Sequence, residues 1–144
     1  MRNTVLKLVV VSGVLGVLSA GSVFAAEPVK VVYHLTEGLD QSAKGLNNIR
    51  NHLQADPTAQ IIVVSNGDGV ASMMTGAMTP KNEPMQNAIK ALKEKGVDFR
   101  ACNNTLTQRS LDPAKLITEA KIVPSGVAEV ARLQAQEGYV YIKP

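Results

Sequence analysis

Cys102 is the only cysteine of the chain and its one natural nucleophile. The reactive form is the thiolate, which a nearby helix N-terminus or basic group favours. The segment NNTL that follows could begin a helical turn whose backbone N–H groups point back at the sulfur. Because side chains alternate between the two faces of a strand, Cys102 is expected on the same face as the polar Asp98 and Arg100. A buried cysteine acting as a small hydrophobic residue is the alternative, and the pattern leaves both open.

The two histidines, His34 and His52, limit what else the chain can do. His34 ends the first predicted strand, where it could act as a base or a hydrogen-bond partner for Cys102. A histidine bonded to local backbone is the alternative. His52 falls off the apolar stripe of the first predicted helix, so we expect it to be solvated. No Ser/His/Asp set and no zinc-ligand spacing can be assembled, so the sequence defines no enzyme class.

Four methionines cluster in the middle of the chain, at positions 73, 74, 78 and 85. Thioethers are soft ligands, so a copper(I) site is one interpretation, with Met74 and Met78 one helical turn apart. Methionine more often fills gaps in a core, and we favour that interpretation. No metal site is therefore predicted.

Alternating strand and helix patterns position these residues. Apolar side chains at 39, 43, 46, 49 and 53 form one helical stripe, while the continuous run IIVV at 61–64 is typical of a strand covered on both faces. Strands are predicted at 29–35, 61–64, 97–101, 121–123 and 139–142, with helices at 39–53, 70–78, 85–92 and 113–119 and after Ser125. This order predicts an α/β fold of three α/β/α layers around a mostly parallel five-stranded sheet.

In such sheets ligands meet the loops at the carboxyl ends of the strands. The predicted ligand pocket gathers there the residues Asn66, Gly67, Asp68, Gly69, Asn103, Asn104, Thr105, Ser125 and Gly126. The turn at 66–69 could cradle an anion with its backbone N–H groups. Ser72 stands where a dinucleotide fingerprint has glycine, and no Walker lysine follows, so nucleotide binding is disfavoured.

Residues 1–25 have the pattern of a secretory signal peptide. Two basic residues precede a short apolar run, and Val23-Phe24-Ala25 offers small residues for cleavage after Ala25. The sequence thus predicts an exported, periplasmic protein with one domain at 26–144 and no membrane contact after cleavage. Without the leader the chain has thirteen basic and twelve acidic residues, so the net charge falls from +3 to +1. No basic cluster or aromatic platform argues for nucleic acid.

Four segments taken together resemble the DsrE/DsrF-like family, in its exported and poorly characterised branch. They are LNNIRNHL, SNGDG, GVDFRACNNTL and VPSGVAEVARLQAQEGYVYIKP. The resemblance implies a flavodoxin-like three-layer fold and a homo-oligomer, either a trimer or a hexamer. In the sulfur-relay members a cysteine after the third strand carries sulfur as a persulfide, and Cys102 matches that place. Nothing in the resemblance implies a flavin, and no cofactor is predicted.

Three functional hypotheses follow. The first is a sulfur carrier that uses Cys102, with a sulfur-donor or acceptor protein or a small thiol as partner. The second is a non-catalytic ligand-binding or scaffolding oligomer, consistent with the lack of a second catalytic group. Tyr139 and Tyr141, two apart on the last strand, could pack under a helix or across a subunit boundary. The third is a methionine-rich copper-binding protein.

Overall fold

Five parallel strands form one sheet in the order β4-β3-β2-β1-β5. The computed structural model describes residues 27–144, and the predicted leader at 1–25 lies outside the described residues. The strands are β1 (Lys30–Leu35), β2 (Gln60–Ser65), β3 (Asp98–Cys102), β4 (Ala120–Val123) and β5 (Val140–Ile142). Across 27–144, no helix is both long enough and apolar enough to cross a membrane.

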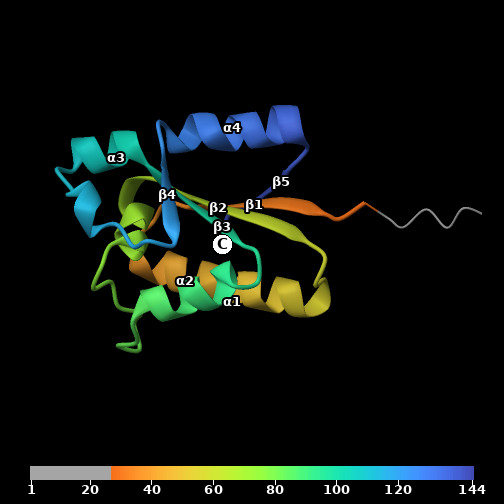
Figure 1. The fold of residues 1–144 in the computed structure, drawn as a ribbon, viewed down its shortest axis with the longest axis horizontal. Coiled ribbons are helices and arrows are strands. Elements are labelled where there is room, and N and C mark those ends of the chain that lie inside the picture. Colours follow the sequence, from red (N-terminus) through yellow and green to blue (C-terminus); the bar gives the residue numbers. More distant parts are fainter. Residues whose placement is uncertain (1–26) are drawn as a thin grey trace, which may run out of the picture.

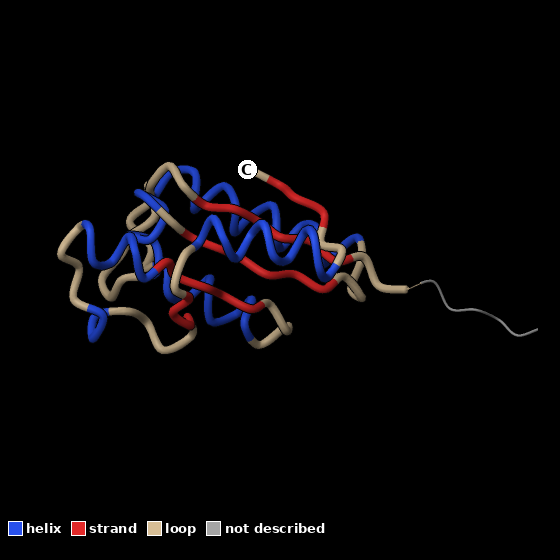
Figure 2. Tube along the Cα trace, turned by 90° about the horizontal axis from the view of Figure 1, so that it is seen from above, coloured by secondary structure: helices blue, strands red, loops and turns tan. Residues whose placement is uncertain are grey.

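Helices lie on both faces of the sheet, as Figure 1 shows. The α-helices are α1 (Leu39–Ala55), α2 (Met85–Lys93), α3 (Asn103–Gln108) and α4 (Gly126–Glu137), and the 3₁₀ helices are η1 (Gly67–Met73) and η2 (Pro113–Lys115). Helices α1 and α2 cover one face and α4 covers the other (Figure 1). The tube view in Figure 2 shows the strands running side by side. The predicted three-layer α/β fold is confirmed.

The strand order explains the placement of the helices. The chain steps from β1 to β4 in one direction and then returns past β1 to β5. Because parallel crossovers are right-handed, the reversal moves the last helix to the opposite face. The order differs from the 2-1-3-4-5 order of flavodoxin. The likeness to flavodoxin is therefore one of layers and of parallel strands.

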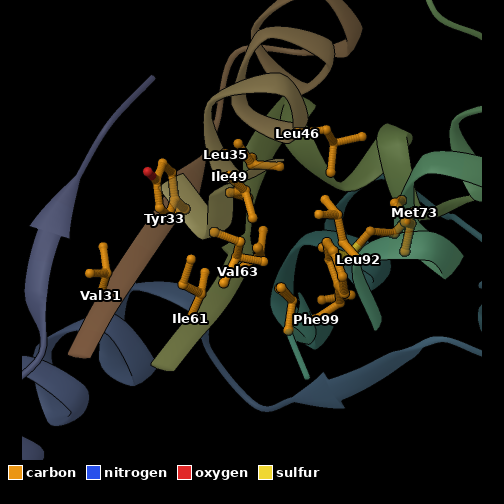
Figure 3. Close-up of a cluster of buried hydrophobic side chains, with 14 of the residues drawn as sticks. Val31, Tyr33, Leu35, Leu46, Ile49, Ile61, Val63, Met73, Leu92 and Phe99 are labelled. Carbon is orange, nitrogen blue, oxygen red and sulfur yellow. The ribbon is translucent and has the colours of Figure 1, made fainter. Parts of the chain in front are cut away.

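The alternating residues of β2 divide the core between the two faces. Ile61 and Val63 belong to the large cluster against α1 and α2, together with the fully buried Phe99 (Figure 3). Ile62 and Val64 belong to the smaller cluster beneath α4. Both faces of β2 are thus covered, which is what the continuous apolar run predicted.

Two predicted helices are shorter than expected. The helix predicted at 70–78 is the 3₁₀ helix η1, which ends at Met73, and that predicted at 113–119 is only the single turn η2. Both stop because their chains pair with each other. The N–H of Thr75 donates to the carbonyl of Lys115 at 2.7 Å, and that of Ile117 donates to the carbonyl of Met73 at 2.9 Å. A contact between segments forty residues apart overrides the local helical pattern.

Gly69 fixes where η1 sits on the sheet. A Cβ at this position would lie 2.1 Å from the carbonyl oxygen of Leu35, the last residue of β1. No side chain fits so close to backbone, so only glycine permits this approach. The loop 66–69 is therefore held against the carboxyl end of the sheet.

We expect Gly69→Ala to lower the free energy of unfolding by about 3 kcal/mol, because backbone must move to admit the methyl group. Gly76→Ala is the matched control. Its φ of +85° strains any side chain, but its surroundings are open, so a loss of only about 1 kcal/mol is expected. Chemical denaturation of both variants measures the difference. Equal losses would contradict the packing role of Gly69.

Candidate functional site

Cys102 lies where β3 ends and α3 begins. It is the last residue of the strand and the N-cap of the helix. Its side chain is 4% exposed and contacts the buried Val70 and Leu106. The thiol is therefore buried in the monomer, which was one of the two alternatives that the sequence left open.

The other side of the sulfur faces hydrogen-bond donors. Burial alone would raise the pKa of Cys102. The hydroxyl of Thr105 and the backbone N–H groups of Gly126, Thr105 and Asn104 are donors beside the sulfur that favour its charged form, and together they outweigh burial, so that the pKa of Cys102 lies below its ordinary value. These N–H groups come from the first turns of α3 and α4, as the sequence predicted for NNTL. The site therefore favours the thiolate, the nucleophilic form of cysteine.

The hydroxyl of Thr105 is oriented by the loop after β2. The N–H of Gly67 donates to Thr105 Oγ1 at 3.0 Å. This bond holds the oxygen in place as an acceptor, and the hydroxyl hydrogen remains available as a donor toward Cys102, which lowers the pKa of the thiol. Thr105 is itself buried, so water competes little for that hydrogen.

Gly126, the first residue of α4, closes over the thiol. A Cβ on Gly126 would lie 3.2 Å from the Cβ of Cys102 and 3.0 Å from that of Asn66. Ser125 caps α4 by accepting the N–H of Ala128 at 3.4 Å. The small residue lets the helix N-terminus, with its partial positive charge, reach the sulfur.

An ion pair anchors α4 above the sheet. Arg100 lies on β3 two residues before Cys102 and pairs with Glu129 of α4. Arg100 also donates to Asp98 Oδ2 from Nε at 3.0 Å and from Nη2 at 2.7 Å. The strand phase that Cys102 shares with Asp98 and Arg100 is thus the face toward α4. The pair of Arg100 and Glu129 thus helps to fix the position of α4 relative to Cys102.

His34 does not bond to Cys102 in this structure. Its Nε2 lies 2.8 Å from Asn66 Oδ1, and its Nδ1 lies 3.0 Å from the hydroxyl of Tyr141 on β5. Burial lowers the pKa of His34, the hydrogen bond that the ring donates to Asn66 opposes this, and the charge of Lys143 lowers the pKa further. The ring is therefore a neutral group that forms hydrogen bonds with two side chains. It lies on β1, which is next to β2 in the sheet.

The remaining predicted pocket residues divide into two groups. Asn66, Gly67, Thr105 and Gly126 converge around Cys102 together with the backbone of Asn104. Asp68 instead pairs with Arg109 at the surface, Gly69 packs on β1, Asn103 is exposed at the start of α3, and Ser125 caps α4. The structure thus gathers about half of the predicted pocket at the thiol.

Two surface hollows lie away from this site. A hollow of about 80 Å³ lies between α1 and α2 and includes Leu46 and Ala88 in its lining. A second of about 460 Å³ lies at the amino ends of β2 and β3 and includes Gln60 and Asp98. Neither is lined by Cys102. Cys102 is therefore surrounded by side chains that touch it directly, such as Val70 and Leu106, and neither hollow opens onto it.

The methionines do not form the arrangement that a copper site would need. Met73 and Met85 are fully buried in the protein interior. Met74 and Met78 are only partly buried, and the chain between them is not helical. The expected spacing of one helical turn is therefore wrong, and the packing interpretation of Met73 and Met85 is confirmed.

Sequence reasoning missed the environments of two aromatic pairs. Tyr141 bonds to His34, and the partly buried His52, expected to be solvated, lies with Nδ1 3.0 Å from the hydroxyl of Tyr33. Tyr139 precedes β5 and packs on the cluster beneath α4. The contact of Tyr141 with His34 depends on β5 pairing with β1, which the chain order alone does not reveal.

Taken together, the fold and the site define a three-layer α/β protein with one buried cysteine, Cys102, at the carboxyl edge of its sheet. The model of the DsrE/DsrF-like family matches residues 30–144. The chain therefore belongs to the DsrE/DsrF-like family. The sequence-based assignment to this family is confirmed, whereas its exported branch remains a prediction.

Solved structures agree with the fold. A protein of unknown function from Methanobacterium thermoautotrophicum, MTH1491, is 28% identical with a TM-score of 0.71, covering 81% of this chain and 99% of its own. The ychN protein from E. coli is 13% identical with a TM-score of 0.65, covering 83% and 100%. At this identity the second likeness concerns the fold alone. No curated protein sequence matches the chain.

We expect Thr105→Val to slow alkylation of Cys102 by iodoacetamide about tenfold near neutral pH, since a hydrogen bond to a charged group is lost. Because the thiol pKa rises, the pH profile moves to higher pH, and the rates converge once both thiols are ionised. Thr105→Ser keeps the hydroxyl and should react nearly as the parent does. A parental profile for a folded valine variant would contradict the role of this hydroxyl.

Proposed function

We propose that this protein is a sulfur carrier that holds sulfane sulfur on Cys102 as a persulfide. The observation that carries the proposal is the set of donors at the sulfur, from Thr105 and the first turns of α3 and α4, which lower the pKa of the thiol. A cysteine acting only as a small hydrophobic residue would have its pKa raised by burial. The donors therefore favour chemistry at this thiol.

The proposed transfer is a thiol exchange that balances without an external oxidant or reductant. The Cys102 thiolate attacks the outer sulfur of a donor persulfide, R–S–S–H. A new S–S bond forms, the donor S–S bond breaks, and the donor leaves as a thiolate that takes up a proton. An acceptor thiolate then attacks the outer sulfur on Cys102 and releases the original thiolate.

The donors at the site suit both states of the carrier. A persulfide is anionic on its outer sulfur when ionised, and the N–H groups of two helix starts favour negative charge. The low exposure of Cys102 favours a narrow reagent, such as a small hydropersulfide or a persulfide at the tip of a donor protein. A small thiol or a protein thiol could act as acceptor. Membership in the DsrE/DsrF-like family supports the proposal.

We further propose that the protein works in the periplasm after cleavage behind Ala25. The support is the signal-peptide pattern of residues 1–25. In an oxidising compartment a lone thiol has no internal disulfide partner. Burial under α4 protects Cys102 from large oxidants and leaves it for sulfur exchange.

Incubation of the protein with a small hydropersulfide should add the mass of one sulfur atom. Because Cys102 is the only cysteine, mass spectrometry of the intact chain locates the sulfur, and a subsequent thiol should remove it. Cys102→Ser is the control and should gain nothing. The carrier function fails if the parent protein also stays at its original mass.

A scaffolding oligomer is the second candidate function. Exposed apolar side chains lie at both edges of the sheet, on β4 at Ile122 (45%) and on β5 at Val140 (52%) and Tyr141 (41%). Edge strands with exposed apolar residues are common sites of association. We propose a homo-oligomer, a trimer or a hexamer, that forms through these edges.

Light scattering coupled to size exclusion should give a mass above that of the monomer. Ile122→Glu should reduce this mass, because a buried unpaired charge is costly at an interface. Cys102→Ser should leave it unchanged. A monomeric parent protein would contradict the oligomer, whereas an oligomer without sulfur uptake would favour scaffolding over sulfur transfer.

A further inference from the structure

A chain of hydrogen bonds runs from the edge strand β5 toward the thiol. It begins at Tyr141, which is 41% exposed and whose hydroxyl lies 3.0 Å from His34 Nδ1. On the other side of the ring, Nε2 lies 2.8 Å from Asn66 Oδ1. An amide oxygen only accepts hydrogen bonds, so Nε2 carries the proton and Nδ1 of the neutral ring accepts from Tyr141. The two bonds therefore fix one tautomer and one ring orientation.

Asn66 joins this chain to the donors at Cys102. The residue after it, Gly67, donates its N–H to Thr105 Oγ1 at 3.0 Å. The Cβ of Asn66 also lies beside Gly126, whose N–H is one of the groups that lower the pKa of Cys102. A shift of Asn66 thus moves the Gly67 N–H that holds the Thr105 hydroxyl. It also opens space beside Gly126, the first residue of α4.

We propose that His34 is a positioning residue that sets the reactivity of Cys102 through Asn66. Both ring nitrogens are engaged, and neither bond goes to Cys102. His34 therefore acts by holding Asn66, and with it the Gly67 N–H, in the orientation that aims the Thr105 hydroxyl at the sulfur. This differs from a base that takes the proton of the thiol directly.

The half-buried polar cluster of His34, Asn66 and Tyr141 lies where the strand order reverses. Strand β1 lies between β2 and β5. From β1 the chain adds β2, β3 and β4 on one side, and it then returns to place β5 on the other side. Crevices at such switch points usually hold ligands. Here the side chains of His34 and Tyr141 meet at that point, and Lys143, paired with Glu37, is the charged group beside the ring.

The proposal rests on the proposed function only for its biological purpose. Thiol reactivity is measured with iodoacetamide and needs no sulfur donor. Absence of sulfur uptake by the parent protein would remove the carrier function, while the pH profile of alkylation would still decide the role of His34. The two failures are therefore distinguishable.

The test is the pH profile of alkylation of Cys102 in His34→Leu, in the full chain without its leader. We expect the profile to move to higher pH and the rate near neutral pH to fall about threefold to tenfold, as when an oriented hydrogen bond is lost. His34→Gln, whose amide can still donate to Asn66 Oδ1, should recover part of the rate. Asn66→Ala should show the same shift, and the double variant with His34→Leu should add little to it.

His52→Gln is the matched control. His52 forms the same kind of pair, with Nδ1 3.0 Å from Tyr33 Oη and the rings edge to face. It lies on α1, against the opposite face of the sheet from α4, so its loss should leave the profile unchanged. A parental profile in folded His34→Leu would overturn the proposal. Should that variant not fold, a parental profile in Asn66→Ala would overturn it instead.

Discussion

The close approach of α4 to β3 is the contact on which the site depends. Gly126 begins α4 beside Cys102, and an added Cβ on it would lie only 3.2 Å from the Cβ of Cys102 and 3.0 Å from that of Asn66. The pair of Arg100 with Glu129 holds the helix in this position. Because α4 begins beside the thiol, the N–H of its first residue lies at the sulfur and supplies part of the charge stabilisation that burial removes.

This contact reconciles two properties that usually oppose each other in a cysteine. A side chain 4% exposed and packed on Val70 and Leu106 has the surroundings of an inert core thiol. The donors from Thr105, Asn104 and Gly126 occupy its other side and reverse the effect of burial on the pKa. The result is a thiol sheltered from bulk solvent whose ionised form is favoured over that of an ordinary cysteine, in a setting where hydrogen bonds to charge count for more than in water.

Much of the fold could be predicted because its pattern is local. The continuous apolar run of β2 and the stripe of α1 each indicated burial, and the alternation of elements indicated parallel pairing. The helices expected at 70–78 and 113–119 were wrong because Met73 and Thr75 pair with residues near Lys115, a contact invisible to local periodicity. For the site, topology placed Asn66, Thr105 and Gly126 beside Cys102. The role of Tyr141 could not be foreseen, since it depends on the register of β5 against β1.

The most direct test of the account is a titration of the Cys102 thiolate by its ultraviolet absorbance, with Cys102→Ser as the blank. We expect the folded protein to form thiolate at lower pH than the same protein unfolded in denaturant, because the donors are assembled only in the native state. A native thiol that ionises at the same pH as the unfolded one, or at a higher pH, would contradict it. Such a result would mean that burial dominates at this sulfur and that the site is not built for thiolate chemistry.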